Sequence, residues 1–125
     1  MRIVGKVALA ALVGAAISVS VQADGDVALG EKVFRKCKAC HSFNPAKKTM
    51  GPTLAGVMGR KAAAVEGYKY SKGFKKLDVV WDDASMAAFL KAPRKFAKGT
   101  KMAFGGLKKP ADIENLLAYV KANAK

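Results

Sequence analysis

The chain has 125 residues, with 23 lysines and arginines against nine aspartates and glutamates, and its formal net charge is +14. This length predicts a single domain, and two cysteines with one histidine are too few for the four ligands of a structural zinc site. The basic balance predicts an anionic partner.

Residues 1–23 have the pattern of an export signal. Two positive charges precede an uncharged run of 16 residues at 7–22, and small side chains stand at Val21 and Ala23. We expect cleavage after Ala23, export to the periplasm, and a mature domain at 24–125 with a charge of about +12. An uncleaved membrane anchor is the alternative, although the run is shorter than the roughly 20 residues of a spanning helix.

Export narrows the choice of anionic partners. Nucleic acid is the usual first candidate for a strongly basic protein, but exported proteins rarely meet it. We therefore expect no nucleic acid as a partner. Acidic docking faces on other proteins are the first expectation, and anionic lipid is the second.

The first helix is expected at 26–37. Asp26 can cap its N-terminus, and Val27 and Phe34 fall on one stripe at helical spacing. Gly30 lies in the same stripe, where glycine lowers helix stability. Its position therefore predicts a close contact with another helix.

The segment Cys37-Lys38-Ala39-Cys40-His41 has the C-x-x-C-H pattern of c-type haem attachment. Two thiols at this spacing can add to the two vinyl groups of one haem, and the next imidazole can then bind the iron. A thioredoxin-like pair would need a βαβ context, and a disulfide across so small a loop would stabilise little. We therefore predict one covalent haem c on Cys37 and Cys40, with His41 as an iron ligand.

Three more helices are expected after this motif, at 53–58, 82–91 and 110–122. Asp82 can cap the second of them, and proline at position 110 suits the first turn of the third. The segments between them lack clear periodicity and predict long loops. The loop at 60–80, together with the residue after it, offers four donors to haem propionates: Arg60, Tyr68, Tyr70 and Trp81.

The second iron ligand is expected to be a methionine. His41 is the only histidine, so a second histidine ligand is excluded. Met86 falls on a helix stripe and suits the core, whereas sequence reach alone does not exclude Met50. We favour Met102, which lies in a glycine-containing loop far enough along the chain to reach the other face of the ring. His/Met ligation raises the reduction potential and leaves no axial position for substrate, which indicates an electron carrier.

Further motifs extend over essentially all of 24–125. They are Gly30 and Phe34 before the haem motif, then Gly51-Pro52-Thr53-Leu54, Gly59-Arg60, Gly67-Tyr68-Lys69-Tyr70, Trp81, Pro93, Gly99-Thr100-Lys101-Met102 and Leu116-Leu117-Ala118-Tyr119. With them the chain resembles a class I cytochrome c, most closely the bacterial cytochrome c2 group. The resemblance implies an all-α, single-haem fold in which the N- and C-terminal helices cross and long loops wrap around the haem.

The resemblance also implies roles for individual residues. Cys37 and Cys40 would carry the haem between the axial ligands His41 and Met102, and the carbonyl of Pro52 would accept the other ring N–H of His41. The residues near the propionates would be Arg60, Tyr70 and Trp81, with Tyr68 a weaker candidate.

The implied function is that of a soluble periplasmic one-electron carrier, monomeric and not an enzyme. Its usual partners would be a quinol:cytochrome c oxidoreductase and an oxidase or photosynthetic reaction centre. Two alternatives stay open, a ligand-binding or peroxidase-like haem protein and a dedicated acceptor for one periplasmic dehydrogenase. The basic ring that docks partners would consist of Lys36, Arg94, Lys95, Lys101 and Lys108.

Two phenylalanines depart from the mitochondrial-like pattern. Phe89 stands where a tyrosine often reaches the methionine sulfur, and Phe74 stands where a polar residue often holds water. Both changes make the pocket more apolar, so we predict a shifted reduction potential and an altered lability of the iron–sulfur bond. Redox titration of Phe89→Tyr tests this, and an unchanged potential with unchanged ligand stability would contradict it.

Overall fold

The computed structural model describes residues 10–14 and 25–125. Apart from 10–14, the expected signal at 1–23 and its cleavage site after Ala23 lie outside the described residues. Within these two ranges, no helix combines the length and apolar character needed to cross a membrane.

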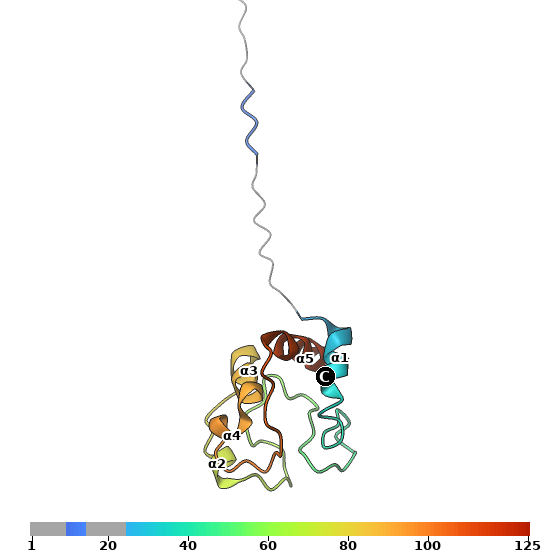
Figure 1. Ribbon diagram of the computed structural model, residues 1–125, viewed down its shortest axis with the longest axis vertical. Coiled ribbons are helices and arrows are strands. Elements are labelled where there is room, and N and C mark those ends of the chain that lie inside the picture. Colours follow the sequence, from blue (N-terminus) through green and yellow to red (C-terminus); the bar gives the residue numbers. More distant parts are fainter. Residues whose placement is uncertain (1–9, 15–24) are drawn as a thin grey trace, which may run out of the picture.

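The part of the chain that the structure describes is helical, without strands; one isolated bridge pairs Lys61 with Val80. α1 (Val27–Phe34) and α5 (Pro110–Asn123) lie together at one end of the domain with α3 (Asp83–Lys91) beside them (Figure 1). The short helices α2 (Lys72–Lys75) and α4 (Pro93–Phe96) lie among the loops (Figure 1). The predicted all-α fold is therefore confirmed.

The predicted starts of three helices are confirmed. The Asp26 carboxylate accepts the backbone N–H of Leu29 at 2.9 Å and caps α1. Asp82 and Ser85 form a reciprocal capping box at α3. α5 begins at Pro110, where the missing N–H of proline costs no helical hydrogen bond. α1 ends earlier than predicted, at Phe34, and turns follow it to residue 40.

The predicted helix at 53–58 is wrong, because turns occupy this segment. The Arg60 guanidinium binds the carbonyl oxygens of Thr53 and Ala55, at 3.0 and 2.9 Å, which a helix would use for its own hydrogen bonds. Gly56 has a φ of +64°, which is also incompatible with a helix. The chain therefore turns here and brings Arg60 back against the segment before it.

Two short helices lie in segments that were expected to be loops. The Ser71 hydroxyl accepts the backbone N–H of Phe74 at 3.1 Å and starts α2. Pro93 is buried at the first position of α4, where its fixed φ favours a new helical turn. Both helices have only four residues, too few to show a helical period in the sequence.

The first and last helices cross at Gly30, as predicted. The N–H of Asp26 donates to the side-chain oxygen of Asn115 at 2.8 Å. A Cβ atom on Gly30 would overlap the carbonyl oxygen of Asn115 in α5. One turn later, the rings of Phe34 and Tyr119 lie 5.1 Å apart. Glycine is therefore required at this position because two backbones approach each other there.

Replacing Gly30 with alanine should lower the free energy of unfolding by about 1–3 kcal/mol, because the added methyl group forces the helices apart. Denaturant unfolding of the holoprotein measures the loss. Gly105→Ala is the matched control, since a Cβ there meets no atom within 4 Å. Equal stabilities for the two variants would contradict the close-contact explanation.

Candidate haem-binding site

A cavity of about 240 Å³ opens between the segment that follows α1, the loop at 100–104, and helices α3 and α5. Its wall is mainly apolar and includes buried side chains such as Trp81, Phe89 and Leu116. Thiols, an imidazole and a thioether also reach it, from Cys37, Cys40, His41 and Met102. The chain thus brings the four residues predicted to hold haem iron and its ring to one cavity.

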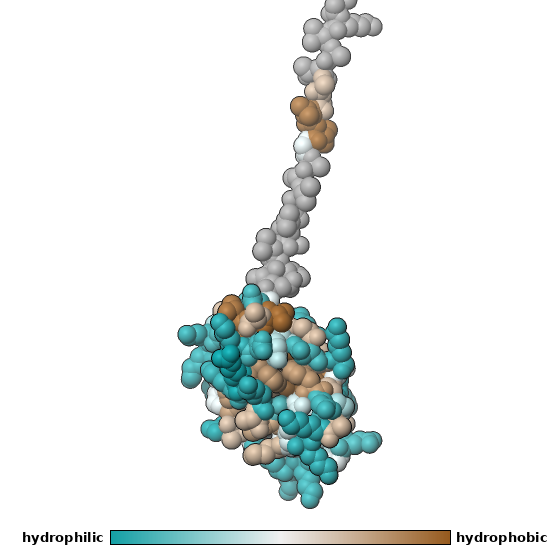
Figure 2. All heavy atoms as spheres, turned by 90° about the vertical axis from the view of Figure 1, so that its right-hand side faces the viewer, coloured by the Kyte–Doolittle hydropathy of each residue, from teal (hydrophilic) through white to brown (hydrophobic). Residues whose placement is uncertain are grey.

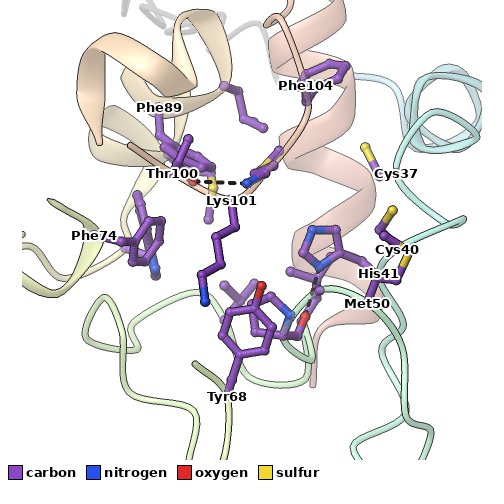
Figure 3. A pocket seen from close by; sticks show the side chains of 18 of the residues that line it. Cys37, Cys40, His41, Met50, Tyr68, Phe74, Phe89, Thr100, Lys101 and Phe104 are labelled. Atoms are coloured by element: carbon purple, nitrogen blue, oxygen red, sulfur yellow. Dashed lines mark hydrogen bonds between the residues drawn. The ribbon is translucent and has the colours of Figure 1, made fainter. Parts of the chain in front are cut away.

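The two cysteines and the histidine share one wall. The N–H groups of Cys40 and His41 both donate to the carbonyl of Cys37, at 3.1 and 3.0 Å, so the segment turns tightly. Cys37, Cys40 and His41 lie together on one side of the cavity (Figure 3). Both thiols are free and partly buried, and burial raises the pKa of the Cys37 thiol, which keeps it protonated at neutral pH.

His41 is held in the form that binds metals. Its Nδ1 lies 2.9 Å from the carbonyl oxygen of Pro52, so Nδ1–H donates and the lone pair of Nε2 stays free. Burial lowers the pKa of His41 despite this hydrogen bond, and the imidazole is neutral at pH 7. A Cβ on Gly51 would lie 2.6 Å from the ring. The expected hydrogen bond between His41 and Pro52 is present. Gly51 leaves room for the imidazole ring because it has no side chain.

The opposite wall carries Met102. In Figure 3 its neighbours Thr100 and Lys101 lie across the cavity from His41. The N–H of Met102 donates to the Thr100 hydroxyl at 3.3 Å, and the Met102 side chain packs against the core. Met50 lines the cavity too, but it lies beside His41 and is 80% exposed. This placement favours Met102 over Met50 as the second ligand, and the ligand role itself stays a prediction.

The residues predicted to lie near the haem propionates all reach the cavity. Arg60, Tyr68, Tyr70 and Trp81 all line it. The Arg60 Nε is buried and finds no hydrogen-bond partner within 25–125. The Tyr70 hydroxyl accepts the N–H of Val65 at 3.2 Å and keeps its own proton to donate, and burial raises its pKa. Donors beside an apolar cavity fit haem, which is a flat apolar ring with two carboxylates.

Two features of the site were not predicted. Lys101, expected only in the docking ring, donates from its Nζ to the carbonyl of Lys69 at 2.7 Å. It therefore connects the Met102 loop to the loop around Tyr68. Ala63 lines the cavity with a φ of +61°, a conformation that favours glycine. No sequence signal marks either feature, because the first is a long-range contact and alanine does not indicate a left-handed turn.

The phenylalanines that depart from the mitochondrial-like pattern both line the cavity. The centre of the Phe89 ring lies 5.3 Å from the ring centre of Trp81 and 5.9 Å from that of Phe74. Phe96 completes this cluster, 5.8 Å from Phe89. The wall on this side is therefore aromatic and, at positions 74 and 89, without hydroxyl groups.

Two thiols at the attachment spacing, a neutral histidine beside them and an apolar cavity in a small all-α domain define a c-type haem protein. The family model for cytochrome c matches residues 27–124. The chain is 45% identical to cytochrome c-554 of Methylosinus trichosporium, over 96% of this chain and 92% of that protein. It is 46% identical to cytochrome c2 of Rhodoblastus acidophilus, over 77% and 91%.

A solved structure has the same fold. Cytochrome cH from Methylobacterium extorquens superimposes with a TM-score of 0.73 at 44% identity, covering 78% of this chain and 99% of that one. The chain therefore belongs to the cytochrome c family. Members of this family are electron-transfer proteins, not enzymes, and bind haem c covalently. The predicted class, fold, cofactor and non-enzymatic nature are thereby confirmed.

Arg60→Lys should lower the free energy of unfolding by about 1–3 kcal/mol, because lysine can replace at most one of the two hydrogen bonds to Thr53 and Ala55. Denaturant unfolding of the holoprotein measures this. Arg94→Lys, on the exposed surface, should leave stability unchanged. An Arg60→Lys protein as stable as that control would show that the paired contacts contribute nothing.

Proposed function

We propose that this protein is a periplasmic carrier that moves single electrons between membrane-bound respiratory or photosynthetic complexes. One observation carries the proposal: a neutral, oriented His41 faces a cavity whose opposite wall holds the Met102 loop. Haem c held between these residues would supply an iron that alternates between the ferric and ferrous states. If His41 and Met102 both bound this iron, no coordination position would be open to a substrate.

Different residues of this chain would hold different parts of the haem. Cys37 and Cys40 would form its two thioether bonds. Pro52 keeps the proton on Nδ1 of His41, so that Nε2 would be free to bind the iron. Arg60, Tyr70 and Trp81, which line the cavity, would bind or surround the propionates. The buried, unpartnered Nε of Arg60 supports this assignment.

Absorbance spectroscopy of the ferric protein tests the ligand pair. We expect the weak far-red band of methionine sulfur on ferric haem in the wild type, and its loss in Met102→Ala. Met50→Leu is the matched control, because Met50 also lines the cavity but lies on the side of His41. Loss of the band in Met50→Leu, or its absence from the wild type at neutral pH, would refute the assignment of Met102.

The partners proposed are acidic faces of a quinol:cytochrome c oxidoreductase and of an oxidase or reaction centre. Hydrophilic residues cover much of the face shown in Figure 2. The five residues of the proposed docking ring are all exposed, and the chain carries 14 more positive than negative charges. The ring consists of Lys36, Arg94, Lys95, Lys101 and Lys108.

The rate of electron transfer to a purified bacterial cytochrome c oxidase should fall as ionic strength rises, because salt screens the attraction between a basic and an acidic face. Stopped-flow oxidation of the ferrous protein over a salt series measures this. A rate that does not change with salt would contradict electrostatic docking.

Periplasmic location follows from the proposed signal at 1–23. Two positive charges, an uncharged run and small residues before position 24 support it. Mass spectrometry of the protein purified from its native cells should give a polypeptide that begins at Asp24. A mass that includes residues 1–23 would instead support a retained anchor.

A further inference from the structure

Met50 is a largely exposed residue. Its exposed fraction is 80%, against 8% for Met86. Met58 and Met102 are only partly exposed, and both pack against the core. Among the methionines at 25–125, Met50 is therefore the most accessible to dissolved reagents.

The backbone around Met50 is nevertheless fixed. The N–H of Gly51 donates to the carbonyl of Cys40 at 2.7 Å, and the Thr49 hydroxyl donates to the carbonyl of Gly51 at 3.1 Å. Figure 3 shows Met50 next to Cys40 and His41 at the cavity. Burial of so exposed a side chain adds little stability. These hydrogen bonds hold Met50 at the rim of the haem site. Packing in the core does not explain why a methionine stands there.

We propose that Met50 is a site of reversible oxidation by peroxides. A sulfur lone pair attacks one oxygen of hydrogen peroxide, an S–O bond forms and the O–O bond breaks. The departing hydroxide takes up the proton of the transferred oxygen and leaves as water. The thioether is oxidised by two electrons to the sulfoxide, and the peroxide is reduced. Susceptibility follows exposure, and methionine sulfoxide reductases reverse the change.

The product would alter the rim of the cavity. A sulfoxide is polar, whereas the thioether is an adaptable apolar contact of the kind that interaction surfaces use. This consequence rests on the proposed function, because it requires a redox partner to approach the rim beside Cys40. Oxidation adds no net charge, so we expect weaker docking with an unchanged dependence on salt.

Peptide mass mapping of the ferric holoprotein during limited exposure to hydrogen peroxide tests the site. The peptide with Met50 should gain one oxygen several-fold faster than the peptide with Met86, because Met50 is 80% exposed and Met86 only 8%. Methionine sulfoxide reductases should then remove this oxygen. The proposal is overturned if Met58, Met86 or Met102 gains oxygen as fast as Met50, or if the reductases do not reverse the change.

Steady-state turnover with a purified bacterial cytochrome c oxidase tests the consequence. Oxidised wild type and Met50→Gln should both show a KM raised several-fold with kcat unchanged, whereas Met50→Leu should match the untreated wild type. Val80→Gln is a second control, since Val80 is 55% exposed but does not line the cavity. A wild-type KM for Met50→Gln overturns the docking effect. If the oxidase oxidises neither the wild type nor any variant, the proposed function fails. The oxidation site at Met50 is decided separately, by the peptide mapping.

Discussion

The crossing of α1 and α5 is the contact on which the other parts of the structure depend. α1 leads directly into the segment with Cys37, Cys40 and His41, so the position of α1 determines where these three side chains stand. α5 supplies Leu116 and Val120 to the cavity wall, and α3 packs against α5. Because Gly30 lets the two backbones meet, the attachment segment and the apolar wall are held in one fixed relation.

The loops are ordered mainly by side chains that bind backbone groups, since regular structure is scarce there. Arg60 fixes the turn at 53–55, and Pro52 at its start orients His41. Lys101 joins the Met102 loop to the carbonyl of Lys69, in the loop around Tyr68. Loops whose backbone groups are bound by side chains in this way can enclose a ligand without the hydrogen bonds of a β-sheet.

Much of the fold and site could be predicted where the signal is local. Caps at Asp26 and Asp82 and the proline at 110 mark helix starts, and the attachment motif occupies five consecutive residues. The helix expected at 53–58 was wrong because Arg60, which lies beyond it, takes its carbonyl groups. The distinction between Met50 and Met102 depends on which wall each occupies and how exposed it is, and neither property is visible in the sequence.

The hydrogen bond between Asp26 and Asn115 also constrains when the domain can fold. It joins residues 89 positions apart, so closing the loop between them costs about 4 kcal/mol of chain entropy. The helix crossing therefore cannot form on a growing chain until α5 has emerged from the ribosome. Until then the polypeptide lacks the helix contact that fixes the attachment segment against the apolar wall.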